Sequence, residues 1–327
     1  MKAFFIVLVA SFAGVSSFAS VTSLTSATSS TRTSRTSGIS RTSSISRTSN
    51  IIFTGDILLD RGVRQVIERK GIDCLFTKQV DSLFRSADVV VGNLECPATN
   101  IKAPMQKRFI FRGEPIWLSA LKKHGFTHLN LANNHSIDQG RNGLIDTQRN
   151  IRKNKIKPVG IGKNMNEAAK PILLTSHPRK VWLIASLRMA LENFAYLPDC
   201  PSINQESTEA IIKRIHGIKQ KDPQAVVIVS LHWGAEHTLQ PVPSQRLEAH
   251  RLVKAGADAL ICHHTHTLQT IEHYKGRDIY YSIGNFIFDQ QKPLNSKACI
   301  VKVEVTADDV KTQALPIDIR GCVPHLN

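Results

Sequence analysis

After residue 50, short apolar runs alternate with amphipathic stretches along the chain. The runs have the length and β-branched content of strands, and the stretches between them have the apolar spacing of helices. Strands are expected over Ile51–Phe53, Val89–Val91, Thr127–Leu131, Pro158–Gly160, Val181–Ala185, Ala225–Leu231 and Asp258–Cys262. Helices are expected over Gly62–Lys70, Leu75–Phe84, Pro115–His124, Gly140–Asn154, Gln205–Ile218 and Ser244–Ala255. This alternation predicts an α/β fold in which helices cover the faces of a sheet.

From residue 268 onward, predicted strands follow one another without intervening helices. They cover Leu268–His273, Ile279–Ser282, Cys299–Val305 and Lys311–Ile317, with turn signals at Gly276 and Asp308-Asp309. Strands joined by short turns pair antiparallel. We therefore expect residues 51–327 to form one domain, a two-sheet sandwich flanked by helices.

The first 19 residues have the pattern of a secretory signal peptide. Met1-Lys2 precedes the apolar run Ala3–Val15, and Ser17-Phe18-Ala19 offers a cleavage site. An uncleaved membrane anchor is the alternative, although the run is shorter than the about 20 residues that span a bilayer. Residues 20–50 are mostly Ser, Thr and Arg, and we expect them to form a disordered tether. The pattern predicts an exported protein, periplasmic or extracellular.

The chain is strongly basic, with 42 Lys and Arg against 26 Asp and Glu. Residues 1–50 contain five of the basic residues and no acidic ones, which leaves a surplus of +11 in the predicted domain. Such a surplus favours anionic partners, and we expect an anionic envelope polymer or a phosphorylated substrate. Nucleic acid is disfavoured because no recognition helix or zinc-finger spacing is present. The six cysteines contain no C-x-x-C pair that would predict a zinc or redox site.

Five polar clusters lie at or just beyond the ends of predicted strands. They are Thr54-Gly55-Asp56, Gly92-Asn93-Leu94-Glu95, Asn133-Asn134-His135, His232-Trp233-Gly234 and His263-His264-Thr265-His266. The carboxyl ends of strands in an α/β sheet meet at one edge, where ligands bind. Carboxylate, amide and imidazole groups are metal ligands. The clusters therefore predict a centre for one or two metal ions at this edge.

Single members of these clusters have simpler interpretations. Asp56 alone could cap a helix or lead a turn, and Arg61 could pair with Asp56 or hold an anionic substrate. Glu95 follows a buried strand, where an unpaired carboxylate is costly and a metal ion or an arginine would relieve that cost.

The last histidine cluster is the most concentrated set of metal donors in the chain. If the segment is extended, His264 and His266 point to the same side and share one centre, while His263 faces the other way. His237, further into a loop, is expected to face solvent.

These motifs, together with Ser282-Ile283-Gly284-Asn285-Phe286, resemble the CapA family of bacterial capsule and poly-gamma-glutamate synthesis proteins, in the same order from about Ile51 to Asp289. That family is related to calcineurin-like metallophosphoesterases, so the resemblance implies a four-layer α/β/β/α sandwich. It implies the metal ligands Asp56, Glu95, Asn134, His232, His264 and His266. It further implies a catalytic set of His135, Asp56 and Arg61, with His135 as the general acid.

The chain departs from the phosphoesterase pattern at two places. Asp56-Ile57-Leu58 has no imidazole where Asp-x-His is usual, and Gly92-Asn93 replaces Gly-Asp, with the carboxylate moved to Glu95. We expect divalent ions, with Mn, Fe and Zn as candidates, in a hydrolase that acts on an anionic envelope polymer. One alternative is a phosphoesterase. The other is a non-catalytic polymer-binding component that works with membrane-bound parts of a polymer synthase.

Overall fold

The computed structural model describes residues 48–290 and 292–327. The predicted signal peptide and the predicted tether up to residue 47 lie outside the described residues. The first described strand, β1, starts at Ser49, two residues before the predicted strand. Within the described ranges, no helix is long and apolar enough to cross a membrane.

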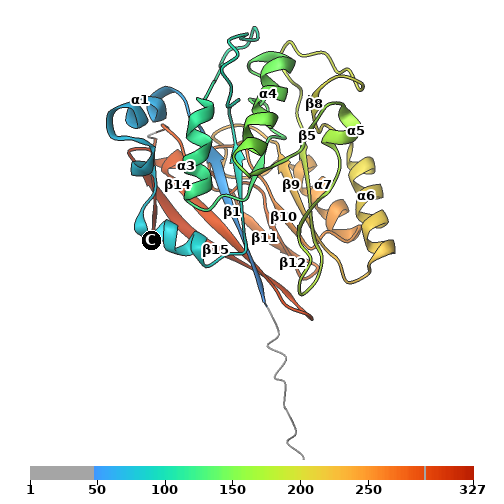
Figure 1. Ribbon diagram of the computed structural model, residues 1–327. Coiled ribbons are helices and arrows are strands. Elements are labelled where there is room, and N and C mark those ends of the chain that lie inside the picture. The colour runs from blue at the N-terminus through green and yellow to red at the C-terminus, as the bar shows by residue number, and fades with distance from the viewer. Residues whose placement is uncertain (1–47, 291) are drawn as a thin grey trace, which may run out of the picture. The chain divides into compact units, whose positions relative to one another are not determined.

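The first sheet has eight strands in the described part of the chain, in the order β16-β15-β14-β1-β2-β3-β4, and β13 also pairs with β1. Its members are β1 Ser49–Ile57, β2 Val89–Leu94, β3 His128–Asn130, β4 Lys157–Val159, β13 Asn285–Ile287, β14 Lys297–Val305, β15 Val310–Arg320 and β16 Val323–Leu326. Strands β1 to β4 are parallel, whereas β14 to β16 are antiparallel. The early and late parts of the chain therefore meet at β1 (Figure 1).

The second sheet has six described strands in the order β11-β12-β10-β9-β7-β6. They are β6 Ile172–Thr175, β7 Val181–Leu187, β9 Val226–His232, β10 Ala259–Ile261, β11 Ile271–Tyr274 and β12 Arg277–Tyr280. The four inner strands are parallel and the two edge strands antiparallel. A short pair, β5 Ile161–Gly162 and β8 Ser202–Ile203, forms a separate two-stranded sheet.

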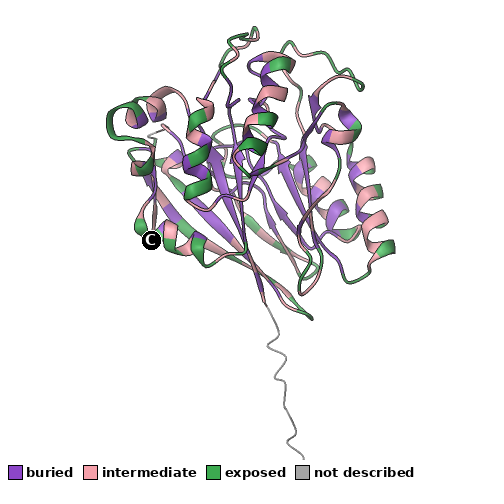
Figure 2. Cartoon of the chain, viewed as in Figure 1, coloured by how far each residue is buried: buried purple, intermediate pink, exposed green. Residues whose placement is uncertain are grey.

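The helices of the described chain are α1 Arg61–Lys70, α2 Lys78–Arg85, α3 Leu118–Lys123, α4 Gly140–Lys153, α5 Met165–Ala168, α6 Thr208–Lys221, α7 Pro243–Lys254 and α8 Pro293–Ser296, with 3₁₀ turns η1 Ile72–Leu75 and η2 Pro115–Trp117. Helices α1 to α4, α6 and α7 lie on the outer faces of the two sheets, whereas α5 packs on the short β5–β8 pair and α8 lies beside His266. Most of their buried residues face the sheets, and exposed residues lie along their outer sides (Figure 2).

Three apolar cores hold the layers together. Along β1, Ile51 and Phe53 point into the core between the sheets, while Ile52 packs with α1 to α4 on the other face. A third core joins the outer face of the second sheet to α6 and α7. Because strand side chains alternate between faces, one apolar run can serve two cores. The order of layers is helix, sheet, sheet, helix, which confirms the predicted two-sheet sandwich flanked by helices.

Some predicted boundaries are wrong for local reasons. Helix α2 begins at Lys78 rather than Leu75, because Thr77 Oγ1 caps it by accepting from Val80 N at 3.2 Å. Helix α6 begins after Ser207, whose side chain accepts from Ala210 N, and it runs on to Lys221. Strands β6, β13 and β16 are too short or too polar for the sequence pattern to predict them.

Strand β1 approaches β13 very closely at Gly55. A Cβ at this position would lie 2.1 Å from the carbonyl oxygen of Gly284. The next residue, Asp56, donates its N–H to that same oxygen at 3.1 Å and lies in register with Asn285. Glycine at position 55 is therefore needed to bring these two polar side chains together.

Gly55→Ala should force β1 and β13 apart and lower the free energy of unfolding by about 1–3 kcal/mol, the usual cost of overpacking. Urea unfolding measures this change. The matched control is Gly217→Ala in α6, where a Cβ would meet nothing within 4 Å. That change should be neutral or stabilise by up to about 1 kcal/mol. Equal effects of the two substitutions would contradict the close approach.

Candidate metal centre

Three neighbouring strands of the first sheet bring polar side chains to one level. Asp56 on β1 is in register with Asn93 on β2 and with Asn285 on β13. Asn93 Nδ2 donates to Asp56 Oδ1 at 2.7 Å, and the Asn285 Oδ1 atom lies 2.9 Å from His266 Nδ1. All four side chains are buried. The two amides therefore orient a carboxylate and an imidazole toward the same space.

The second sheet contributes His232 at the end of β9 and the histidine segment that follows β10. Backbone bridging pairs His232 with His263. His264 has φ +101° and His266 has φ +56°, so the segment is not extended. The prediction that alternation in an extended strand places His264 and His266 on one centre is wrong. His263 faces away as predicted, with Nε2 at 3.1 Å from the carbonyl oxygen of Thr54.

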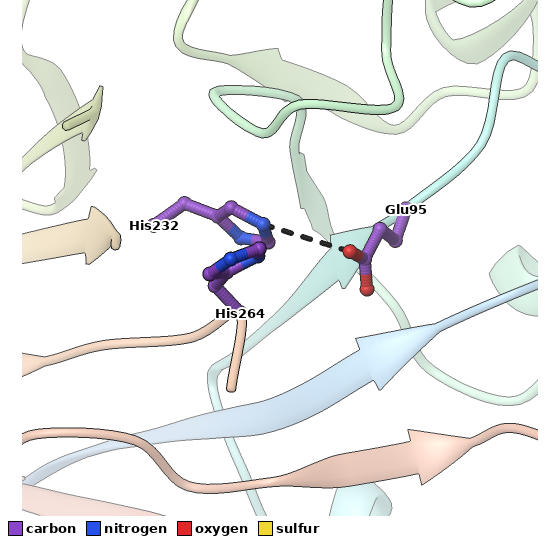
Figure 3. Close-up of side chains that lie close together, drawn as sticks. All are labelled: Glu95, His232 and His264. Atoms are coloured by element: carbon purple, nitrogen blue, oxygen red, sulfur yellow. Dashed lines mark ion pairs between the residues drawn. The ribbon is translucent and has the colours of Figure 1, made fainter. Parts of the chain in front are cut away.

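The side chains form two groups that share Glu95. One group is Glu95, His232 and His264, which point toward one another (Figure 3), and the other is Asp56, Glu95 and His266. Within each group the potential ligand atoms lie within 4.8 Å of one another. Glu95 Oε1 is 3.5 Å from His232 Nε2 and 3.9 Å from His266 Nε2. The arrangement offers two adjacent positions for metal ions with one carboxylate between them.

Several atoms at this site that could ligate a metal ion have no hydrogen-bond partner among the described residues. They are both carboxylate oxygens of Glu95, Oδ2 of Asp56 and Nδ1 of His264, all buried. Asp56 Oδ2 does lie 3.3 Å from His266 Nδ1. Buried charged groups without such bonds are costly unless a cation or another charge compensates them. Carboxylates and imidazoles together suit Mn, Fe or Zn, so the residues fit a divalent metal ion.

The electrostatics of the site follow from burial and from the two carboxylates. Burial, with the neighbouring Asp56 charge, raises the pKa of Glu95 well above its ordinary value. Burial lowers the pKa of His232 well below the usual range and that of His264 to about 4, which keeps both imidazoles in the neutral, ligating form. Burial opposes charge on His266 as well, but Glu95 and Asp56 raise its pKa to about 9. A metal ion that binds there would displace this proton.

Asn134 and His135 lie beside the first group. Asn134 Oδ1 is 2.8 Å from His232 Nε2, so this amide lies beside the first group, and its role as a metal ligand stays a prediction. His135 Nδ1 lies 2.8 Å from Asp138 Oδ2, and its ring packs on Phe111. Burial lowers the pKa of His135, while the hydrogen bond and charge of Asp138 act in the opposite direction. The general-acid role of His135 stays a prediction.

Lys107 supports this part of the site, and the sequence pattern did not indicate it. Its ammonium donates to Asp138 Oδ1 and, at 2.7 Å, to the carbonyl oxygen of Asn134. The side chain is only 3% exposed and that of Asp138 is fully buried. In the sequence Lys107 belongs to a basic loop near Lys102 and Arg108, where a solvated lysine is the ordinary interpretation.

Arg61 pairs with Asp289 and not with Asp56. Its Nε lies 3.1 Å from Asp289 Oδ2, and Nη2 contacts Oδ1 of the same carboxylate. The guanidinium lies over the rings of Phe111 and Phe288, which themselves pack on His135 and His266. The arginine therefore lies beside the site with its side chain 35% exposed. Its contact with an anionic substrate stays a prediction.

His237 belongs to neither ligand group. Its side chain is 38% exposed, and Nδ1 lies 2.9 Å from Asn295 Nδ2. The neighbouring Glu236, 40% exposed, adds negative potential that raises the pKa of Glu95 and His266. The sequence pattern gave no reason to single out Glu236.

Fold and site together define an α/β protein with a buried carboxylate and imidazole centre suited to divalent metal ions. The chain belongs to the family described as "Bacterial capsule synthesis protein PGA_cap", which matches residues 50–290. This match confirms the resemblance to the CapA family that the sequence motifs indicated.

Two relatives show the extent of the similarity. "PGA biosynthesis protein CapA" of Bacillus subtilis (strain 168) is 33% identical over 273 residues, which cover 82% of this chain and 71% of that protein. "Capsule biosynthesis protein CapA" of Bacillus anthracis is 32% identical over 246 residues, covering 72% of this chain and 58% of that protein. The chain thus spans about three fifths to seven tenths of these relatives.

Two solved structures are distantly similar to the chain. A hypothetical protein from Thermus thermophilus is 12% identical with a TM-score of 0.49, covering 82% of this chain and 99% of that one. Haemophilus influenzae NAD nucleotidase (NadN) is 10% identical with a TM-score of 0.45, covering 83% and 56%. Values this low support no conclusion about activity.

Replacing the shared carboxylate should affect both metal positions. Glu95→Ala is expected to remove bound metal from both groups, whereas His264→Ala should leave the group of Asp56, Glu95 and His266 able to bind. Elemental analysis of the purified variants after dialysis measures this. Glu68→Ala, which changes a carboxylate on α1 that is 59% exposed and outside both groups, is the control and should keep the wild-type metal content. Equal metal content in the Glu95→Ala and wild-type proteins would contradict a shared ligand.

Lys107→Met should destabilise the protein by about 3–5 kcal/mol, because it leaves the Asp138 carboxylate buried without its cation. Chemical unfolding measures the loss. Lys123→Met is the matched control: its ammonium also lies 2.7 Å from a carboxylate, that of Asp73, but is 65% exposed. A surface pair of this kind contributes about 0–1 kcal/mol. Similar losses in both variants would mean that burial does not strengthen the Lys107 pair.

Proposed function

We propose that the protein is exported and acts as a metal-dependent hydrolase on an anionic polymer of the cell envelope. The observation that carries the proposal is Glu95, whose two buried oxygens lack hydrogen-bond partners among the described residues and face His232 and His264. Membership in a capsule synthesis family supports a polymer as the substrate class. Export rests on the signal-peptide pattern of residues 1–19. Membrane-bound parts of a polymer synthase are the proposed protein partners.

The proposed reaction adds water across an amide or ester bond of the polymer. Divalent ions bound by the two groups would lower the pKa of bound water and polarise the carbonyl oxygen of the amide or ester to be cleaved. The water oxygen bonds to the carbonyl carbon, the bond to the leaving amine or alcohol breaks, and the leaving group takes up a proton. His135 Nε2 is the proposed site of proton transfer: because Nδ1 is engaged by Asp138, Nε2 takes up the proton that the water loses and then donates it to the leaving group.

Hydrolysis of a simple phosphate ester is the second candidate. Leu58, which occupies the position of the usual imidazole in the first cluster, is fully buried in the core between the first sheet and its helices. One ligand of the phosphoesterase pattern is therefore replaced by a core side chain. This difference favours the envelope polymer over a simple phosphate ester as the substrate.

The test uses the purified protein reconstituted with Mn, Fe or Zn and incubated with poly-gamma-glutamate. Release of new amino groups should require metal. His135→Ala should reduce the rate by about 10²–10⁴, the usual contribution of a general acid, while metal content stays unchanged. His237→Ala removes a half-exposed imidazole outside both groups and should retain the activity.

Three other outcomes would redirect the assignment. Binding of metal and polymer without any cleavage would contradict a hydrolase and support a non-catalytic component of polymer synthesis. Cleavage of phosphate esters, but not of the polymer, would support the second candidate. Full activity in His135→Ala would remove the proposed proton donor.

A further inference from the structure

Three open depressions lie at the amino ends of strands, at the opposite edge from the candidate metal centre. They have volumes of about 470, 370 and 400 Å³. Adjacent residues join them: Ile172 lines the first and Pro171 the second, while Ile218 lines the second and Lys219 the third. The three depressions are therefore neighbours: the first two adjoin at the start of β6, and the last two adjoin near the end of α6.

The three depressions concentrate positive charge. The first depression is lined by three Lys or Arg side chains and no acidic one. The second is lined by three basic side chains and one acidic one, and the third by four basic side chains and one acidic one. The difference is a net +8, most of the +11 surplus of the predicted domain. Five of the lysines are exposed and have no ion-pair partner among the described residues: Lys155, Lys157, Lys221, Lys254 and Lys275. We call these five the basic band.

The free charges are all ammonium groups. The three arginines of the depressions are already paired, Arg152 with Glu167, Arg214 with Glu206 and Arg277 with Asp258. Arg214 and Arg277 are engaged at 2.5 and 3.0 Å, and only Arg152, 3.6 Å from Glu167 and 55% exposed, keeps guanidinium donors open to a phosphate or carboxylate. Ammonium groups on flexible stems attract anionic groups without demanding a fixed register. The band fits a flexible, linear polyanion better than a rigid anionic ligand.

The dimensions agree with such a partner. The depressions extend from β4 of the first sheet to β6, β7, β10 and β12 of the second. At about 4.8 Å between strands the second-sheet part covers about 20 Å, and the step of about 10 Å between sheets brings the total to about 30 Å. An extended peptide-like chain advances by at most about 3.6 Å per residue. With one carboxylate per residue it would place about eight charges over this distance, enough to reach all five free lysines. We propose that the basic band binds a linear polycarboxylate chain.

The band and the candidate metal centre are separate sites. Strand β9 starts at Val226 near the band and ends at His232 in the centre, and seven residues at about 3.3 Å each span about 20 Å. A polymer longer than this could be held by the band while another segment reaches the centre. Such tethering raises the effective concentration of the polymer at the metal site. The choice of a polycarboxylate rests on the proposed function, but binding can be measured without turnover.

The test compares two triple variants of the full chain with equal changes of charge. Lys155→Glu/Lys157→Glu/Lys221→Glu changes the band. Lys70→Glu/Lys78→Glu/Lys122→Glu, the control, changes three exposed lysines on α1 to α3 that have no ion-pair partner among the described residues. The probe is fluorescent poly-L-glutamate, with anisotropy recorded over a range of salt concentrations.

The band variant should bind poly-L-glutamate at least about tenfold more weakly than wild type. The slope of log K against log salt concentration should be smaller in magnitude by about three than that of wild type. The control should bind within about twofold of wild type at equal salt, because its changed residues lie outside the contact. Thermal unfolding and metal content of both variants should match wild type, which separates a binding defect from misfolding. In a version of the band variant with Lys→Gln at the same three positions, weaker binding would come from the loss of attraction alone, without the repulsion that glutamate adds.

Several results would overturn the band as a polycarboxylate site. One is equal loss of binding in the two triple variants, which would indicate general charge attraction. Another is no binding by the wild type. A third is a defect confined to vesicles of anionic phospholipid, which would assign the surface to a membrane. By contrast, intact poly-L-glutamate binding without metal or cleavage would contradict the proposed function and leave the band supported.

Discussion

The Glu95 carboxylate is the constraint on which the site depends. It is fully buried, both oxygens lack hydrogen bonds from the described residues, and the nearest charge-bearing groups are another carboxylate and three imidazoles. Keeping a carboxylate charged in such surroundings requires a compensating cation. The protonated His266 provides one positive charge, and bound divalent ions would supply more. The amides of Asn93 and Asn285 and the Lys107 pair with Asp138 hold the surrounding ligands in place.

The site exists only because two sheets pack face to face. Asp56 lies on β1 and Glu95 directly follows β2, both in the first sheet, whereas His232 ends a strand of the second. Packing of the core between the sheets therefore sets the distances between these side chains. The site also requires the close approach of β1 to β13 at Gly55, which brings Asp56 next to Asn285. Changes in this core should therefore alter metal binding without touching a ligand. The basic band lies at the opposite edge, so the proposed polymer binding and the candidate metal centre can be altered independently.

The sequence predicted the layers, and it predicted which residues gather at the candidate site, because both depend on local pattern. Apolar runs identify β1, β2 and β9, and the polar residues at the carboxyl ends of β1 and β2 meet at one sheet edge, where packing of the second sheet adds His232 from β9. Prediction from the sequence failed where tertiary packing sets the backbone conformation of a residue or the partner of its side chain. The positive φ of His264 and His266 divides them between two groups, and no local signal indicates it. Lys107 looks solvated in sequence but is buried, and Arg61 finds its partner 228 residues away at Asp289.

The most direct test of the candidate metal centre is anomalous diffraction from crystals of the purified protein, recorded at the Mn, Fe and Zn absorption edges. The predicted result is two anomalous peaks on either side of the Glu95 carboxylate, one next to His232 and His264 and the other next to Asp56 and His266. The contradictory result is the absence of any peak at these positions after exposure to all three metals, with the Glu95 oxygens hydrogen-bonded to water instead.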